Sequence, residues 1–99
     1  MPNYQVYYKK DLQQDTQEAL DDFENAYVPI MRLWEENLDD VFFTMQGDIW
    51  SPNGEARKVI ENLELTHTSM SIGDVVEDLD TGEWAEVLPF GWRDIKFNV

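Results

Sequence analysis

The sequence contains no cysteine, and this absence excludes a disulfide framework and thiolate metal sites. Positive charge is scarce as well. Seven Lys and Arg residues stand against 21 Asp and Glu residues, which gives a formal net charge of −14. Such a chain repels nucleic acid and anionic membranes, whereas basic surfaces attract it. No apolar run reaches the roughly 18 residues that a membrane span requires. The N-terminal residues lack the basic and apolar regions of a signal peptide, so we expect a cytoplasmic protein that does not bind membranes.

Length and composition favour one folded domain over residues 1–99. A chain of this size can bury a modest core without covalent cross-links. Hydrophobic residues make up 42% of the chain and aromatic residues 13%, and this composition is not that of a disordered protein.

The first third of the chain has the patterns of two strands and a helix between them. Residues 3–10 alternate loosely and are rich in Tyr, as is typical of a strand. From Asp11, the expected N-cap, apolar residues recur at helical spacing for about fifteen residues. Residues 26–34 are apolar and partly β-branched but contain Pro29, which predicts a strand at a sheet edge or one with a bulge.

The middle of the chain is expected to be helical. Asn37 is the expected N-cap of a short helix over residues 38–46. Residues 47–50 are expected to form a connector. Ser51 followed by proline indicates the start of another helix, which ends near residue 63.

The last third has the pattern of β-structure. Residues 67–73 are expected to form a loop, residues 74–78 and 83–88 a hairpin, and residues 90–97 a closing strand. The predicted class is therefore α+β. We expect a small, mostly antiparallel sheet of the N-terminal strand, the hairpin and the closing strand, packed against two to three helices.

Four residues have the side chains of a hydrolase triad: His67, Ser69, Ser71 and Asp74. They lie too close along the chain to come from separate elements, and no Gly-x-Ser-x-Gly turn accompanies them. A histidine among Ser and Thr is more often part of a structural hydrogen-bond network. We therefore expect that the protein is not an enzyme and has no catalytic residues.

The segment that begins at Asp78 has some features of a calcium-binding loop. An EF-hand loop requires glycine at its sixth position and Glu at its twelfth, but these positions hold Glu83 and Pro89. A turn is the better interpretation. We expect no metal site and no cofactor.

The four tryptophans could in principle stack on nucleic-acid bases. Single-strand binding sites also need a cationic groove, which a chain with seven cations and a charge of −14 does not supply. We expect no direct nucleic-acid binding, and core or half-buried positions for these side chains, which are Trp34, Trp50, Trp84 and Trp92.

Carboxylates are concentrated in residues 11–40 and again around the predicted hairpin. Asp15, Glu18 and Asp22 follow at steps of three and four, which places them in a row on the predicted helix. Asp39 and Asp40 suit the first turn of the following helix, where the helix dipole favours negative charge. Ten other carboxylates of these two stretches are the candidate partner-binding residues: Asp15, Glu18, Asp21, Asp22, Glu24, Glu35, Glu36, Asp78, Asp80 and Glu83.

Three segments resemble a group of small, mostly uncharacterised proteins of phages, plasmids and archaea. They are WSPNGEAR (residues 50–57), HTSMSIGDVV (residues 67–76) and FGWRDI (residues 90–95). The group also has an N-terminal YxVYY-like strand. The resemblance implies an α+β fold with the final hairpin in the sheet and an origin in a mobile element, and it implies no reaction.

Charge and resemblance together suggest an inhibitor that mimics DNA inside a host cell. Phosphates of a DNA strand are about 3.4 Å apart along the axis, and carboxylates one helical turn apart lie about 5–6 Å from one another. Both can engage the same Lys- and Arg-lined groove, as on a CRISPR effector or a restriction enzyme. The alternative is a non-enzymatic scaffold or housekeeping protein of a mobile element, whose acidity serves solubility or salt adaptation. Monomer and dimer both stay open.

Overall fold

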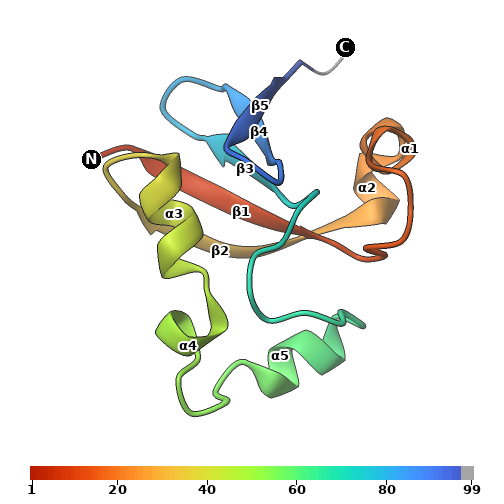
Figure 1. The fold of residues 1–99 in the computed structure, drawn as a ribbon, viewed down its shortest axis with the longest axis vertical. Coiled ribbons are helices and arrows are strands. Elements are labelled where there is room, and N and C mark those ends of the chain that lie inside the picture. The colour runs from red at the N-terminus through yellow and green to blue at the C-terminus, as the bar shows by residue number, and fades with distance from the viewer. Residues whose placement is uncertain (97–99) are drawn as a thin grey trace.

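Residues 1–96, which the structure describes, form an open five-stranded antiparallel sheet and five short helices in a computed structural model (Figure 1). The strands lie in the order β2-β1-β3-β4-β5. Their bounds are β1 Asn3–Lys9, β2 Tyr27–Trp34, β3 Val75–Asp78, β4 Trp84–Val87 and β5 Trp92–Ile95. The helices are α1 Thr16–Asp21, α2 Phe23–Ala26, α3 Leu38–Thr44, α4 Gly47–Trp50 and α5 Arg57–Asn62. The predicted α+β class is confirmed.

The two faces of the sheet carry two separate hydrophobic cores because successive side chains of a strand point to opposite faces. On one face, Tyr4, Val6 and Tyr8 of β1 pack with buried residues of α3 and α5. On the other face, α1 and α2 cover Val75, and half-buried Tyr7 packs against the same cluster. Figure 1 shows α1 and α2 together at one end of β1 and α3, α4 and α5 along the other side of the sheet.

The predicted edge strand is present. β2 is the first strand of the sheet and pairs with β1 alone, and the register shifts between Val6 and Tyr7, next to the position of Pro29. Proline is tolerated there because an edge strand has backbone positions that need no donor.

The expected long N-terminal helix is wrong in its extent. Residues 11–14 form a turn, in which the Asp11 side chain accepts from the amide of Gln13 at 2.9 Å. The N-cap is Asp15, whose carboxylate accepts from the amide of Glu18 at 3.2 Å. Asp22, at φ −123° and ψ 46°, then interrupts the helix between α1 and α2. The helix period continues through this break in the sequence, so the pattern alone did not reveal it.

The middle of the chain differs from expectation in two places. Residues 47–50 form α4 rather than a connector, and the hydroxyl of Ser69 accepts from the amide of Gly47 at 2.7 Å. The following helix begins at Arg57, because Ser51 accepts from the amide of Ala56 and residues 51–56 form turns. The predicted Asn37 cap is confirmed: its side chain accepts from the amide of Asp40 at 2.9 Å, and the helix ends two residues early, at Thr44.

The C-terminal hairpin and closing strand are confirmed. β3 and β4 pair across a turn, and β5 returns along β4. Phe97, the expected end of the closing strand, lies outside the described residues. Of the four tryptophans, Trp34 is 58% exposed and the other three are half-buried. No helix in the described part of the chain has the length and apolar character to cross a membrane.

Candidate functional site

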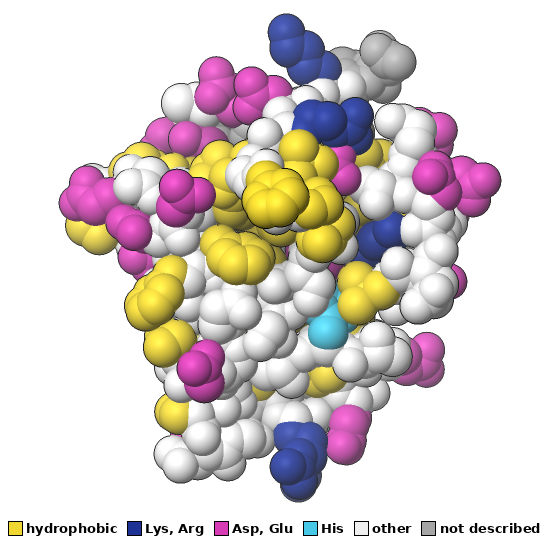
Figure 2. All heavy atoms as spheres, in the orientation of Figure 1, with side chains coloured by type: hydrophobic (Ala, Val, Ile, Leu, Met, Phe, Trp, Pro, Cys, Tyr) yellow, Lys and Arg dark blue, Asp and Glu magenta, His cyan; other side chains and the backbone are white. Residues whose placement is uncertain are grey.

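The ten predicted partner-binding carboxylates fall into two groups at opposite ends of β1, which is about 20 Å long at about 3.3 Å per residue. Near Lys10, whose amide donates to Ala26, lies the helical acidic group of Asp15, Glu18, Asp21, Asp22 and Glu24. Near Asn3 lie the other five: Glu35, Glu36, Asp78, Asp80 and Glu83. Figure 2 shows acidic side chains on two opposite sides of one face of the molecule, with apolar and uncharged side chains between them.

Backbone pairing brings the second group together from distant parts of the chain. Asn3 donates its amide to Asp80 at 2.9 Å, and its carbonyl accepts from Leu79. The amide of Glu35 donates to Pro2 on the other side of β1. The first turn of α3 joins the group, and we call the whole surface the acidic sheet end. Its residues are Glu35, Glu36, Asp39, Asp40, Asp78, Asp80 and Glu83.

The negative charge of the acidic sheet end is not neutralised within the protein. Of the 21 carboxylates in the sequence, only Glu86 forms an ion pair with a Lys or Arg among the described residues; the buried Asp74 contacts His67, and neither carboxylate belongs to this surface. Carboxylates of the acidic sheet end are exposed or half-buried. Some accept neutral hydrogen bonds, such as that from the Trp92 indole to Asp39 at 3.1 Å. The surface therefore presents seven carboxylates at one end of the sheet that a partner can reach.

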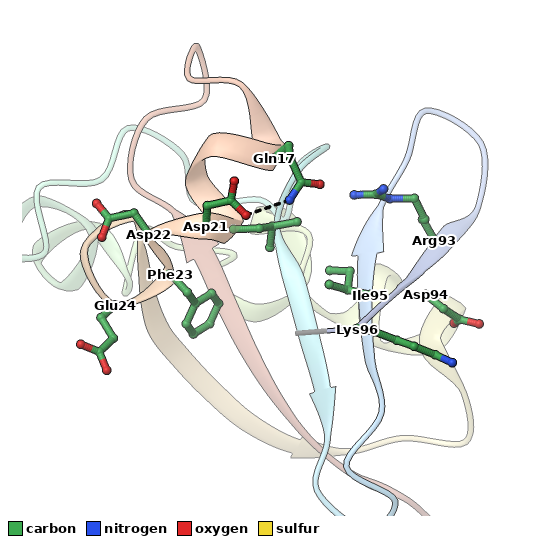
Figure 3. Close-up of a pocket in the computed structure, with 10 residues that line it drawn as sticks. Gln17, Asp21, Asp22, Phe23, Glu24, Arg93, Asp94, Ile95 and Lys96 are labelled. Atoms are coloured by element: carbon green, nitrogen blue, oxygen red, sulfur yellow. Dashed lines mark hydrogen bonds between the residues drawn. The ribbon is translucent and has the colours of Figure 1, made fainter. Parts of the chain in front are cut away.

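The helical acidic group has a different environment. A pocket of about 480 Å³ lies between α1, α2 and β5, and Figure 3 shows the Arg93 side chain pointing toward Gln17 and Asp21, whereas Asp22 and Lys96 point away from one another. Gln17 donates to Asp21 at 3.0 Å. The expected row of carboxylates is also wrong, because Asp15 and Asp22 both lie outside helical geometry. Arg93 and Lys96 line the same pocket as this group, but neither forms an ion pair with it among the described residues.

Asp74, one of the residues considered for a triad, lies fully buried between β1 and the preceding loop. Its carboxylate accepts from the amide of Lys9 at 2.8 Å, from the amide of Ser71 at 2.7 Å and from Nε2 of His67 at 2.9 Å. Burial raises the pKa of the Asp74 carboxyl above its ordinary value, while these hydrogen bonds act in the opposite direction. The carboxylate thus holds the loop over residues 67–73 against β1.

His67 itself is almost entirely buried. Its ring stacks on Tyr8 at a centroid distance of 4.6 Å, and its Nδ1 atom is buried with no hydrogen-bond partner in the described structure. The Tyr8 hydroxyl donates to the carbonyl of Thr68 at 2.7 Å. Burial raises the pKa of this hydroxyl above its ordinary value.

The two serines near this histidine bond to the backbone. Ser71 donates to the carbonyl of Ser69 at 2.9 Å, and the Ser69 hydroxyl accepts from Gly47. These contacts use both hydroxyls to order the loop, and each pairs with backbone rather than with His67. The arrangement of His67 and Asp74 is therefore that of a structural pair.

Two features were not predicted from the sequence: the Glu86–Arg93 ion pair and the exposed side chain of Phe90. Glu86, 4% exposed in β4, pairs with Arg93 of β5, and the two residues are direct neighbours in the strand register. The opposite charges on two consecutive predicted strands, the second arm of the hairpin and the closing strand, were a usable signal for this pair. Phe90 is almost fully exposed in the β4–β5 turn, whereas the closing strand was expected to begin at this residue and in fact begins at Trp92.

Among the described residues, no three His, Asp or Glu side chains are grouped so that they could hold a metal ion. No family model matches the chain, and no match was found among the curated proteins or the solved structures.

Proposed function

We propose that the protein is a binding protein that engages a basic protein surface of the kind that otherwise holds nucleic acid. The observation that carries this proposal is the acidic sheet end, where seven carboxylates gather without an ion pair among the described residues. Exposed carboxylates that repel one another cost stability, so a surface that keeps them together favours a role in recognition.

The chemistry of this surface matches that of a nucleic-acid groove. Arginine binds carboxylates and phosphates in the same bidentate manner, so a groove lined with Arg and Lys can accept either. A charge of −14 also speeds encounter with a basic partner, at a rate that falls as salt rises. Occupation of the groove would exclude nucleic acid, which makes the protein an inhibitor.

The resemblance to phage and plasmid proteins supports a host defence complex as the partner, namely a CRISPR effector or a restriction enzyme. We place the acidic sheet end first, because the helical acidic group shares its pocket with the side chains of Arg93 and Lys96.

The test compares charge reversals at the two acidic groups. Glu36→Lys with Glu83→Lys changes the acidic sheet end, and Glu18→Lys with Glu24→Lys makes the same change in charge at the helical acidic group; all four side chains are exposed. Each immobilised protein captures proteins from a bacterial lysate at about 50 mM salt and is eluted in a gradient to about 300 mM. Captured nucleic-acid-binding proteins are identified by mass spectrometry and released with a DNA oligonucleotide.

We expect the wild type and the helical variant to retain such proteins and the sheet-end variant to lose them. Retention that survives both charge reversals and the full salt gradient would instead support a scaffold whose acidity serves solubility. Circular dichroism spectra of all three proteins control for folding.

A further inference from the structure

The tip of the β4–β5 turn exposes a large apolar side chain that the fold does not use. Phe90 is 95% exposed, and the turn closes through a hydrogen bond from the amide of Leu88 to the carbonyl of Gly91 at 3.0 Å. Gly91 has a φ of +79°, the geometry in which glycine is favoured after a tight hairpin turn. The turn is thus formed by its backbone and by Gly91, and the Phe90 ring contributes no buried contact.

Phe90 belongs to a wider apolar patch. A groove of about 130 Å³ lies beside the turn, between α3 and the β4–β5 hairpin, and its lining includes Phe42, Leu88 and Trp92. Ile72, which is 57% exposed, adjoins the turn because the next residue donates its amide to the carbonyl of Val87. Figure 2 shows apolar side chains gathered over this part of the face. We define the turn patch as Phe42, Ile72, Leu88, Pro89, Phe90 and Trp92.

The turn patch is continuous with the acidic sheet end. Asp39 lines the same groove, and its carboxylate accepts from the indole of Trp92 at 3.1 Å. Asp40 follows it in the first turn of α3. The cation nearest along the chain, Arg93, is engaged in its ion pair with Glu86. The Asp39 carboxylate, which has no ion pair with a described residue, therefore borders the apolar groove, and Asp40 is its neighbour in the chain.

We propose that the turn patch is the docking site for a protein segment that carries both apolar and basic side chains. The apolar side chains would contact Phe90 and enter the groove, while Arg or Lys of the same segment would pair with Asp39 and Asp40. Charge favours this occupant over a second copy of the chain, because two copies would each bring a charge of −14. Exposed aromatic anchors supply much of the affinity in protein interfaces, whereas rim charges mainly accelerate encounter. The inference rests on the proposed function and adds the apolar component of the partner.

Two synthetic peptides test this inference. One is an amphipathic helix of Leu and Lys, and the other has the same number of lysines but Ser in place of every Leu. Binding of the labelled peptides is measured by fluorescence anisotropy at about 100 mM salt. We expect the wild type to bind the Leu-containing peptide about tenfold more tightly than the Ser-containing one. Phe90→Ser should remove most of this difference, and Phe90→Leu should retain much of it.

The control is Val59→Ser, which replaces an exposed apolar side chain outside the turn patch, 47% exposed, on α5. It should leave both affinities unchanged. A Phe90→Ser protein that still prefers the Leu-containing peptide tenfold would overturn the inference. Equal, salt-sensitive binding of both peptides by the wild type would overturn it and leave the proposed function standing, whereas no binding of either would count against both.

Sedimentation velocity tests whether a second copy of the chain, rather than a basic partner, occupies the turn patch. The wild type should sediment as a monomer at the concentrations of the binding assay. Dimers of the wild type that Phe90→Ser abolishes would show that another copy covers the patch, which overturns the proposal of a basic partner.

Discussion

Asp74 and the acidic sheet end use the same functional group in opposite ways. The Asp74 carboxylate is fully buried and accepts from two backbone amides and an imidazole, so each of its oxygens serves the fold. At the acidic sheet end, seven carboxylates lie at the surface and have no ion pair with described residues. The comparison shows that the contribution of a carboxylate is set by the donors around it. The first kind stabilises the protein, and the second kind is available to a partner.

Removal of the buried carboxylate should have the largest effect. Asp74→Ala leaves the amides of Lys9 and Ser71 without their acceptor in a site that water does not reach. Buried donors without partners are costly, and we expect a loss of about 3 kcal/mol in the free energy of unfolding. Urea denaturation followed by circular dichroism measures this loss.

The matched change at the surface is Glu36→Ala, which removes an exposed carboxylate of the acidic sheet end. It should change the free energy of unfolding by less than about 0.5 kcal/mol. Equal losses in the two variants would show that Asp74 does not hold the loop against β1.

The second-largest effect should be on the pH dependence of stability, in which the buried Asp74 differs from the exposed carboxylates. Burial raises the pKa of Asp74, so the folded state keeps a proton on this group at pH values where the unfolded state, with a pKa of about 3.9, has lost it. The folded state then binds more protons, and stability falls as pH rises from about 4 through the raised pKa.

Asp74→Asn has no proton to lose at this site. We expect it to be less stable than the wild type throughout, because an amide group cannot accept from both backbone amides as a carboxylate does. Its stability should nevertheless decline less steeply over this pH window. Urea midpoints measured between about pH 4 and about pH 7 give both slopes, and parallel slopes would contradict the raised pKa.

Neutralisation at the surface should give the smallest effect, in the direction of greater stability. Glu36→Gln with Glu83→Gln removes two exposed charges from a surface that repels itself. We expect a gain of up to about 0.5 kcal/mol at low salt, and the gain should disappear at about 1 M salt, where the Debye length is about 3 Å. A gain that salt does not reduce would have a cause other than repulsion.

Local patterns predicted those elements whose signals are local. The Tyr- and Val-rich alternation predicted β1, the Asn37 side chain predicted the start of α3, and the turn residues around Gly82 predicted the β3–β4 hairpin. Each of these depends on residues within a few positions of one another. The sequence therefore carried enough information for the α+β class and for most of the sheet.

Some errors had local causes, such as the break at Asp22 and the turns after Ser51, whereas others came from contacts between distant segments. The first turn of α4 depends on Ser69, and the amide of Lys9 depends on Asp74, which is 65 positions away. For the same reason, the sequence did not show that Glu35 and Glu36 lie with the carboxylates of the hairpin, at the end of β1 opposite the helical acidic group. Only the pairing of both sides of β1 shows that Glu35 and Asp80 lie near one another.

The position of β1 between β2 and β3 has a consequence for how the chain folds. β2 follows β1 closely and can pair with it early, but the partner on the other side arrives late: Tyr7 and Glu77, joined by a side-chain hydrogen bond, are 70 positions apart. Closure of such a long loop slows folding. During synthesis, one edge of β1 therefore stays unpaired until most of the chain has left the ribosome.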